Sequence, residues 1–316
     1  MPASSGLTWV RYGSIFVNPK LSREMRIAAQ PLYRFRQLAR VERDFTKNIG
    51  DLLEFIRVPT SEDIQAISPL SETEPIPMSR LVVSRGQLRV DEYGSGFNWT
   101  GKLEDLSQFS VEHVVVRKLT VRIVAGLDYL AGITLKSTPI KYIPTGASSY
   151  TITTDGSVPA AAGSNLNSYH VKNIVDYFKE QLWAPGYDGN DYLCVASVRA
   201  LRGLRDDTEW LQAALYGDPD RLFNYEVGKL HGVRFVESNH PLILQKKGTG
   251  GILGEALFIA DDPLIEGIVQ GEHIRIDSEK DFGRFKSAAW YYLGGFALTW
   301  DTPNPGEGRV IHVTGA

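Results

Sequence analysis

Residues 191–217 read DYLCVASVRALRGLRDDTEWLQAALYG, and this stretch does most to decide the fold. It opens with an apolar run at 192–196, whose length and composition predict a buried strand. Ser197 follows in the position of a helix N-cap, which predicts a helix through about residue 205. A second helix is expected over 207–216, because a glycine and a proline follow it.

The alternation of strands and helices continues on both sides of this stretch. Upstream, residues 168–183 predict the clearest helix of the chain, with one apolar stripe formed by Val171, Ile174, Val175, Phe178 and Leu182. Downstream, strands are expected at 233–237, 242–244, 256–259, 274–276, 288–298 and 309–313. Helices and strands of this kind predict an α+β fold.

Further upstream, the sequence predicts a long helix at 106–130, because its apolar residues recur on one helical face. Asp105 would cap this helix and Gly132 would end it. A helix of this length spans about 37 Å. Residues 133–167 are rich in Gly, Ser, Thr and Ala and indicate a loop or a short hairpin.

Residues 51–99 indicate a two-stranded excursion with a loosely built tip. Strands are expected at 52–58, 81–83 and 87–99, the last with a bend or bulge at Gly94 and Gly96. The tip, PTSEDIQAISPLSETEPIPMSR at 59–80, is rich in proline, serine and acids. If about 14 residues run out and as many return, the ribbon reaches roughly 45 Å. Because such a hairpin is marginal alone in water, it needs a surface on another subunit.

Residues 1–48 resemble an arm more than a core. A helix is expected at 21–44, and Pro31 would kink or end it. The arm carries nine basic and three acidic residues, a net charge of +6 in a chain whose total is −3. Two interpretations stay open: a solvated basic helix, or a basic arm that faces a polyanionic partner.

The composition is that of a globular chain without covalent cross-links. Its 316 residues, 43% of them hydrophobic, can bury about three quarters of the unfolded surface. Cys194 is the single cysteine, which excludes an internal disulfide and fits a reducing compartment. The first residues lack the apolar core of a signal peptide, and no apolar run approaches the ~18 residues of a membrane span.

The sequence offers no catalytic, metal or cofactor motif. The glycine-rich stretch at 247–254 lacks the final Lys-Ser or Lys-Thr of a phosphate loop and the glycine spacing of a dinucleotide site. The six histidines are scattered without metal-ligand spacing. Cys194 lies in an apolar run, where a thiol is expected to be buried with a raised pKa. We therefore expect no cofactor and no enzyme activity.

Three stretches in order resemble the major capsid proteins of tailed bacteriophages with the Hong Kong 97-type fold. The first is 192–238, which begins YLCVAS and ends FNYEVGKLHGVRFVES. The second is GEALFIADDPLIEG at 254–267, followed by GEHIRID. The third is DFGRFKSAAWYYLGGFALTW at 281–300, followed by a turn and RVIHV. The resemblance covers nearly the whole chain and rests on order and spacing, not on one diagnostic motif.

The resemblance implies a role for each segment. Residues 1–48 would be the N-terminal arm, and 49–100 the extended loop with its flanking strands. Residues 101–134 would hold the spine helix of the peripheral domain. Residues 135–265 would form the axial domain, and 266–316 the C-terminal strands of the peripheral domain.

The function implied is that of a major capsid protein without catalytic activity. Such a chain would assemble as pentamers and hexamers into an icosahedral phage head around double-stranded DNA. It would be part of the virion, after assembly in the host bacterial cytoplasm. Expected partners are copies of itself, a separate scaffolding protein, the portal, a decoration protein and packaged DNA, with no membrane. The arm is too short for a fused scaffold, and the loop lacks the lysine that some relatives cross-link.

Two groups of residues are candidates for intermolecular contacts. On the extended loop, the candidates for inter-subunit contacts are Glu72, Glu74, Arg80 and Arg85. On the arm, the candidates for an inner-face contact with DNA or scaffold are Arg23, Arg26, Arg34, Arg36 and Arg40.

Three alternatives stay open. The first is an encapsulin-type compartment shell, which shares the fold but encloses protein cargo. The second is a soluble α/β enzyme, because residues distant in sequence can still assemble a site. The third is another virion component, such as a tail or decoration protein.

Overall fold

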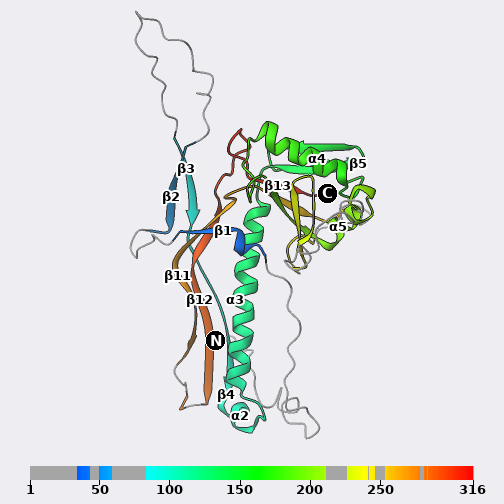
Figure 1. Ribbon diagram of the computed structural model, residues 1–316. Coiled ribbons are helices and arrows are strands. Elements are labelled where there is room, and N and C mark those ends of the chain that lie inside the picture. The colour runs from blue at the N-terminus through cyan, green and yellow to red at the C-terminus, as the bar shows by residue number, and fades with distance from the viewer. Residues whose placement is uncertain are drawn as a thin grey trace, which may run out of the picture.

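Two β-sheets joined by one long helix form the body of the subunit (Figure 1). This computed structural model describes residues 34–42, 50–58, 83–210, 226–240, 242–245, 253–277, 281–282 and 284–315. A four-stranded sheet and the helix make an elongated lower part, and a seven-stranded sheet with its helices makes the rounded upper part (Figure 1). The expected α+β class is confirmed.

The four-stranded sheet has the order β1-β11-β12-β4. Its strands are β1 (Ala39–Glu42), β11 (Leu264–Ile276), β12 (Phe285–Leu298) and β4 (Asp91–Thr100). β1 runs parallel to β11, and the other pairs are antiparallel. Of the bend or bulge predicted at Gly94 and Gly96, the bulge is not found, because β4 pairs with β12 without any shift of register. A Cβ at Gly94 would lie 2.7 Å from the carbonyl oxygen of Trp290, so glycine there permits close strand approach.

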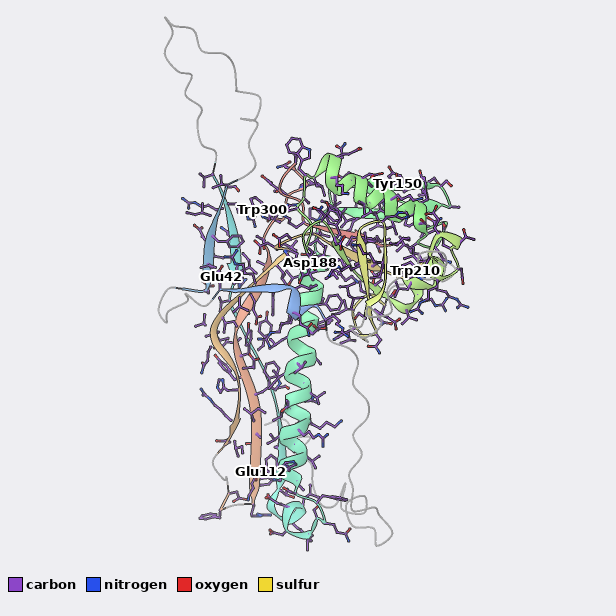
Figure 2. All side chains as sticks on the ribbon, in the orientation of Figure 1. Glu42, Glu112, Tyr150, Asp188, Trp210 and Trp300 are labelled. Carbon is purple, nitrogen blue, oxygen red and sulfur yellow. The ribbon has the colours of Figure 1, made fainter. Side chains whose placement is uncertain are left out.

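The long helix is α3 (Val111–Lys136), which follows the short α2 (Gly101–Leu106). The prediction of one helix over 106–130, capped by Asp105 and ended by Gly132, is wrong at both ends. The hydroxyl of Ser110 accepts from the His113 amide and caps α3. Gly132 lies inside the helix, where a side chain would overlap Ile243. The buried stripe of α3 packs on the sheet through Val111, Val115, Leu119, Ile123 and Leu127. Glu112 marks the end far from the seven-stranded sheet (Figure 2).

The seven-stranded sheet has the order β6-β5-β13-β10-β7-β9-β8. Its strands are β5 (Lys141–Gly146), β6 (Ser149–Thr153), β7 (Tyr192–Ser197), β8 (Glu226–Leu230), β9 (Val233–Ser238), β10 (Ala256–Ile259) and β13 (Val310–Val313). The helices α4 (Ser168–Asp176), η3 (Tyr177–Gln181) and α5 (Val198–Arg205) pack on it around one apolar core.

Several predicted elements of this part are confirmed. The helix at 168–183 appears as α4 and η3, and the buried strand at 192–196 is β7. The Ser197 hydroxyl accepts from the Ala200 amide and caps α5. β5 and β6 form the short hairpin expected within 133–167. Of the helix expected at 207–216, residues 207–210 are described, and 208–210 of these are helical.

Other predicted strands are corrected. Residues 242–244 form a turn, because the His240 ring accepts from the Leu242 amide at 3.2 Å and Leu244 has a φ of 55°. The strand expected at 274–276 is the end of β11, which begins at Leu264. Two shifts of register, between Ile268 and His273, interrupt the alternation of β11 and obscure it in the sequence.

The group of C-terminal strands expected at 266–316 is divided between the two sheets. β11 and β12 belong to the four-stranded sheet, whereas β13 lies between β5 and β10 in the seven-stranded sheet. The reason is burial: all four residues of β13 are buried, so the strand needs a partner on each side.

A separate two-stranded hairpin projects from the body (Figure 1). It pairs β2 (Leu52–Arg57) with β3 (Ser84–Arg89) over six residues each. The prediction that the excursion extends to residue 99 is wrong, because β4 belongs to the four-stranded sheet. The described hairpin therefore spans about 20 Å, and the predicted tip at 59–80 lies outside the described residues. Within the described chain, no helix is long and apolar enough to cross a membrane.

Candidate functional site

The two faces of the β2–β3 hairpin differ in polarity and exposure. One face carries Leu53, Phe55 and Leu88 and packs toward the four-stranded sheet. The other face is exposed, and Ile56 on it is 77% exposed. Leu52 is also exposed, and the guanidinium of Arg85 lies 3.1 Å from the carboxylate of Glu54. This outer face combines apolar and charged groups, as inter-subunit contacts do.

The structure covers part of each predicted group of contact residues. Arg85 lies on the outer face of the hairpin and is 72% exposed. Glu72, Glu74, Arg80, Arg23 and Arg26 lie outside the described residues. Arg34, Arg36 and Arg40 lie where the arm enters the body, next to η1 (Arg36–Leu38) and β1.

Asp128 of α3 anchors the point where the arm enters. Its Oδ1 accepts from the backbone amides of Phe35 at 2.7 Å and Arg36 at 3.0 Å. Burial raises the pKa of Asp128, and the two amides oppose that shift. The Phe35 ring is fully buried between α3 and the sheets. The sequence analysis did not identify Asp128 as an anchor. The one indication in the sequence is that Asp128 lies beside the apolar stripe of the predicted helix.

Arg36 is paired within its own chain. Its Nη2 lies 2.9 Å from the buried carboxylate of Glu266, and its Nη1 lies 2.9 Å from Glu272. The Tyr292 hydroxyl donates to the same Glu266 at 3.0 Å. Hydrogen bonding from Arg36 lowers the pKa of Glu272. Arg40 also lies near an acid, Glu42 at 3.5 Å, but its side chain is 68% exposed, whereas that of Arg36 is 27% exposed. Arg36 is therefore the weaker candidate for DNA contact.

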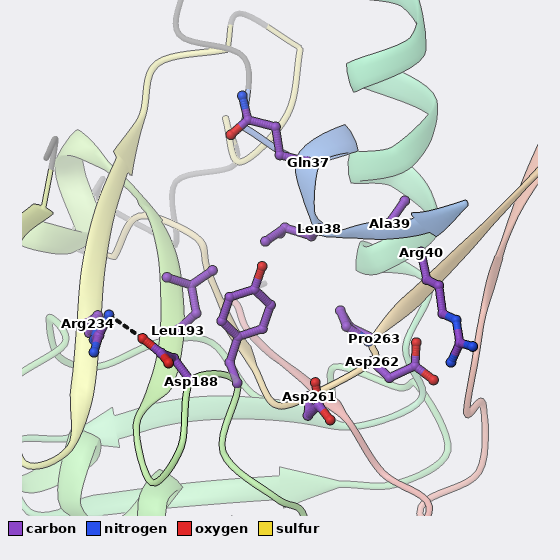
Figure 3. A pocket seen from close by; sticks show the side chains of 11 residues that line it. Gln37, Leu38, Ala39, Arg40, Asp188, Leu193, Arg234, Asp261, Asp262 and Pro263 are labelled. Atoms are coloured by element: carbon purple, nitrogen blue, oxygen red, sulfur yellow. Dashed lines mark ion pairs between the residues drawn. The ribbon is translucent and has the colours of Figure 1, made fainter. Parts of the chain in front are cut away.

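Two open grooves flank the arm where it crosses the body. The first, of about 660 Å³, lies between β1, β9 and the loop of Asp261 and Asp262 (Figure 3). Its one drawn ion pair joins Arg234 to Asp188 at 2.7 Å. The second, of about 800 Å³, lies between β1, α3 and β11. Among the described residues that line the two grooves there is no serine, cysteine or histidine.

Ser168, His231 and Glu209 come together and test the enzyme alternative. Nε2 of His231 lies 2.9 Å from the Ser168 hydroxyl and 3.0 Å from Glu209. The Ser168 hydroxyl also donates to Glu209. A catalytic triad uses the two ring nitrogens separately, one for serine and one for the acid. Here the same atom, Nε2 of His231, contacts both Ser168 and Glu209, so the geometry is not that of a catalytic triad. The contacts instead join α4 to the β8–β9 turn.

A buried polar network links the end of α3 to the seven-stranded sheet. Lys136 lies 2.9 Å from Glu255, whose other oxygen lies 3.2 Å from Nε2 of His312. Lys141 approaches Nδ1 of His312 at 3.2 Å, so a neutral ring that is protonated at Nε2 fits both neighbours. Burial lowers the pKa of His312 to about 4. Burial raises the pKa of Glu255, but hydrogen bonds from His312 and Lys136 lower this pKa by more, to about 2.

Metal and thiol chemistry is not indicated in the described part of the chain. No cluster of three metal-ligating side chains occurs among the described residues. Cys194 is buried, and burial raises the pKa of its thiol, as predicted. Most of the glycine-rich stretch at 247–254 lies outside the described residues.

Comparison with known proteins identifies the fold. No protein-family model and no curated protein sequence matches the chain. Solved structures do match, and the class that they define is the capsid protein of phages: the chain has the Hong Kong 97-type fold of tailed-phage capsids, as predicted.

Three solved structures illustrate the match. The match to the capsid of Helicobacter pylori bacteriophage KHP30 has a TM-score of 0.67 at 12% identity, and the aligned region covers 94% of this chain and 95% of the phage chain. The head of Helicobacter pylori bacteriophage KHP40 has a TM-score of 0.65 at 11% identity, covering 94% of both chains. The match to the cyanophage Pam1 capsid has a TM-score of 0.64 at 13% identity, and the aligned region covers 96% of this chain and 98% of the cyanophage chain.

Proposed function

We propose that this chain is the major capsid protein of a tailed phage and has no catalytic role. In this proposal it assembles as pentamers and hexamers into an icosahedral head that encloses double-stranded DNA. The observation that carries the proposal is the match to solved phage capsid structures, which extends over nearly the whole of this chain and of each matching chain.

The hairpin supports self-assembly, because its outer face has exposed apolar groups that no described part of the subunit covers. Ile56 and Leu52 contribute this apolar surface, and Val58 and Val83 extend it at the hairpin's far end. Exposed apolar surface on a projecting two-stranded element is costly unless another surface covers it. A second copy of the chain would supply that cover.

The edge of the four-stranded sheet gives independent support. β1 pairs with β11 only from Leu264 to Gly267. Among the described residues, β11 from Ile268 to Ile276 has a strand partner on one side only, β12. Such an edge offers backbone donors and acceptors to a further strand, and a shell can cover it.

The remaining partners follow from the basic arm and stay proposals. Arg23, Arg26, Arg34 and Arg40 would face DNA or a separate scaffolding protein on the inner side of the shell. Contacts of this kind are electrostatic and weaken as salt concentration rises. The portal and a decoration protein complete the proposed partners, within a virion assembled in the host cytoplasm.

Electron microscopy of the purified protein, expressed alone and with its scaffolding protein, tests the proposal. We expect closed icosahedral shells or sheets of hexamers. A monomer or small oligomer under all these conditions would contradict the proposal and favour the enzyme alternative. The contents of particles from infected cells separate the two shell alternatives, because a phage head encloses DNA and an encapsulin-type compartment encloses protein.

A further inference from the structure

The hairpin contacts β12 and the residues that follow it at two separate places. At its base, β3 crosses β12 where Gly295 has no side chain, and a Cβ there would overlap the backbone oxygen of Arg89. At the other end of the paired region, Arg57 of β2 reaches Leu298, the last residue of β12, and Asp301 beyond it. The register pairs Leu52 with Arg89 at the base and Arg57 with Ser84 at the far end. The two contacts are therefore roughly 16 Å apart along the hairpin.

The Arg57 guanidinium is held on several sides. The side chain is 6% exposed and forms an ion pair with Asp301. It donates to the carbonyl oxygen of Leu298 at 3.3 Å. Its guanidinium carbon lies 4.9 Å from the ring centre of Phe55 and 5.8 Å from that of Trp300. Trp300 lies on the side of the upper domain that faces the hairpin (Figure 2).

The opposite strand leaves room for this arrangement. Gly86 of β3 pairs with Phe55, and a Cβ at Gly86 would overlap both the Phe55 ring and the Arg57 side chain. Glycine in a strand commonly marks such a close approach. A buried guanidinium is costly unless it is paired and hydrogen-bonded. Any movement of β2 away from Leu298 and Asp301 would therefore leave Arg57 without these partners.

We propose that Arg57 is a positioning residue, which together with the Gly295 crossing fixes the direction in which the hairpin leaves the subunit. A ribbon held at one point can rotate about that point, whereas a ribbon held at two points keeps its direction. The consequence for assembly rests on the proposed function, because only a shell requires the hairpin to meet a neighbour at a set angle. The consequence for the isolated subunit does not.

Hydrogen exchange of the isolated subunit tests the contact itself. Arg57→Met keeps an unbranched apolar chain and removes the charge, and Asp301→Asn removes the exposed partner carboxylate. We expect amide exchange in 52–57 and 84–89 to rise about tenfold or more in Arg57→Met, with a smaller rise in Asp301→Asn. Exchange in α3 and β10 should stay at the wild-type rate. Asp301→Glu retains the carboxylate and should restore slow exchange.

A matched control removes an ion pair elsewhere. Glu237→Gln breaks the pair that Glu237 forms with Arg205 at 2.9 Å on the seven-stranded sheet, and hairpin exchange should not change. If Arg57→Met does not fold, Asp301→Asn decides the question, because the Asp301 side chain is 59% exposed. Wild-type exchange in the hairpin of every folded variant would overturn the proposal.

Electron microscopy of the same variants tests the role in assembly. We expect Arg57→Met to give mostly open or irregular particles where the wild type gives closed ones. Closed, uniform shells from a variant whose hairpin exchanges rapidly would overturn the positioning role. If the wild type itself forms no shells, the proposed function fails, and the exchange experiment still decides whether Arg57 holds the hairpin.

Discussion

Asp128 shows how one residue fixes a long segment. A carboxylate in the interior is costly, and this one is offset by two backbone amides of the incoming arm. The same bonds fix Phe35 in the apolar core, so the start of the described chain is tied to the middle of α3. The function of Asp128 is therefore structural.

Replacement of Asp128 by alanine should destabilise the subunit by about 2 kcal/mol, because one buried and one partly buried amide lose their acceptor. Asp128→Asn keeps an acceptor oxygen and should cost less. Urea unfolding of the isolated subunit measures both changes. Asp176→Asn, at an exposed position on α4, is the control and should lie within about 0.5 kcal/mol of wild type. Equal effects of Asp128→Ala and the control would contradict the anchor role.

His312 makes stability depend on pH. Its folded-state pKa of about 4 lies below the ordinary 6.5, so the unfolded chain binds a proton more readily. Stability is therefore complete above pH 6.5 and is lost as pH falls from 6.5 toward 4. The lowered pKa of Glu255 acts in the same direction but only below about 4.5. Between pH 7 and pH 5 Glu255 contributes no change, but burial also lowers the pKa of His170, which adds to the loss. A variant that lacks His312 is therefore needed to measure its share.

Between pH 7 and pH 5, His312 should account for a loss of about 2 kcal/mol in the free energy of unfolding. Urea unfolding at the two pH values measures this loss. In His312→Gln the difference between the two pH values should shrink by that amount. His113→Gln removes an exposed histidine and should keep the wild-type difference. An unchanged pH dependence in His312→Gln would refute the assignment.

At the scale of elements, the sequence predicts those whose local pattern agrees with their surroundings. β7, α4 and α5 combine a clear apolar pattern with a capping residue or a sharp boundary, and all are found. β11 was mostly missed because Gly267, Gly271 and two shifts of register break its alternation. Gly132 led to a wrong end for α3, because a glycine is needed there for the packing of Ile243 and does not end the helix.

The crossing of β3 over β12 gives an element-scale prediction. Gly295→Ala should separate the hairpin from the sheet, because a Cβ would overlap the Arg89 backbone oxygen. We expect a destabilisation of about 2 kcal/mol, the usual cost of overpacking. Gly271→Ala on β11 is the matched control, since no atom lies within 4 Å of its added Cβ. Urea unfolding compares the two, and similar small effects would show that the crossing is looser than the structure indicates.

At the scale of the whole molecule, the predicted order of segments gave the fold, but the contacts between segments were not predictable. The sequence identified the hairpin as a projection and Arg85 as an exposed charge on it. It did not identify Asp128, Glu266 or Arg57, because each depends on a partner more than 90 residues away. Pairings over such separations leave no local pattern.

Deletion of residues 60–80 should give a folded subunit that does not form closed shells. The segment lies beyond the paired part of the hairpin, so the described core should be unaffected. Circular dichroism and thermal unfolding check the fold, and electron microscopy checks assembly. Closed particles of normal size from this deletion would contradict the role proposed for the extended loop.

The central place of β13 determines when the upper domain can be completed during synthesis. Before residues 310–313 emerge, β5 with β6 and β10 with β7 are two separate half-sheets, each with an open edge. If translation pauses before this point, the nascent chain therefore exposes two strand edges that can pair with other chains. Insertion of this late strand removes both edges, so we expect the pace of translation near the codons for 285–313 to influence the yield of folded subunit.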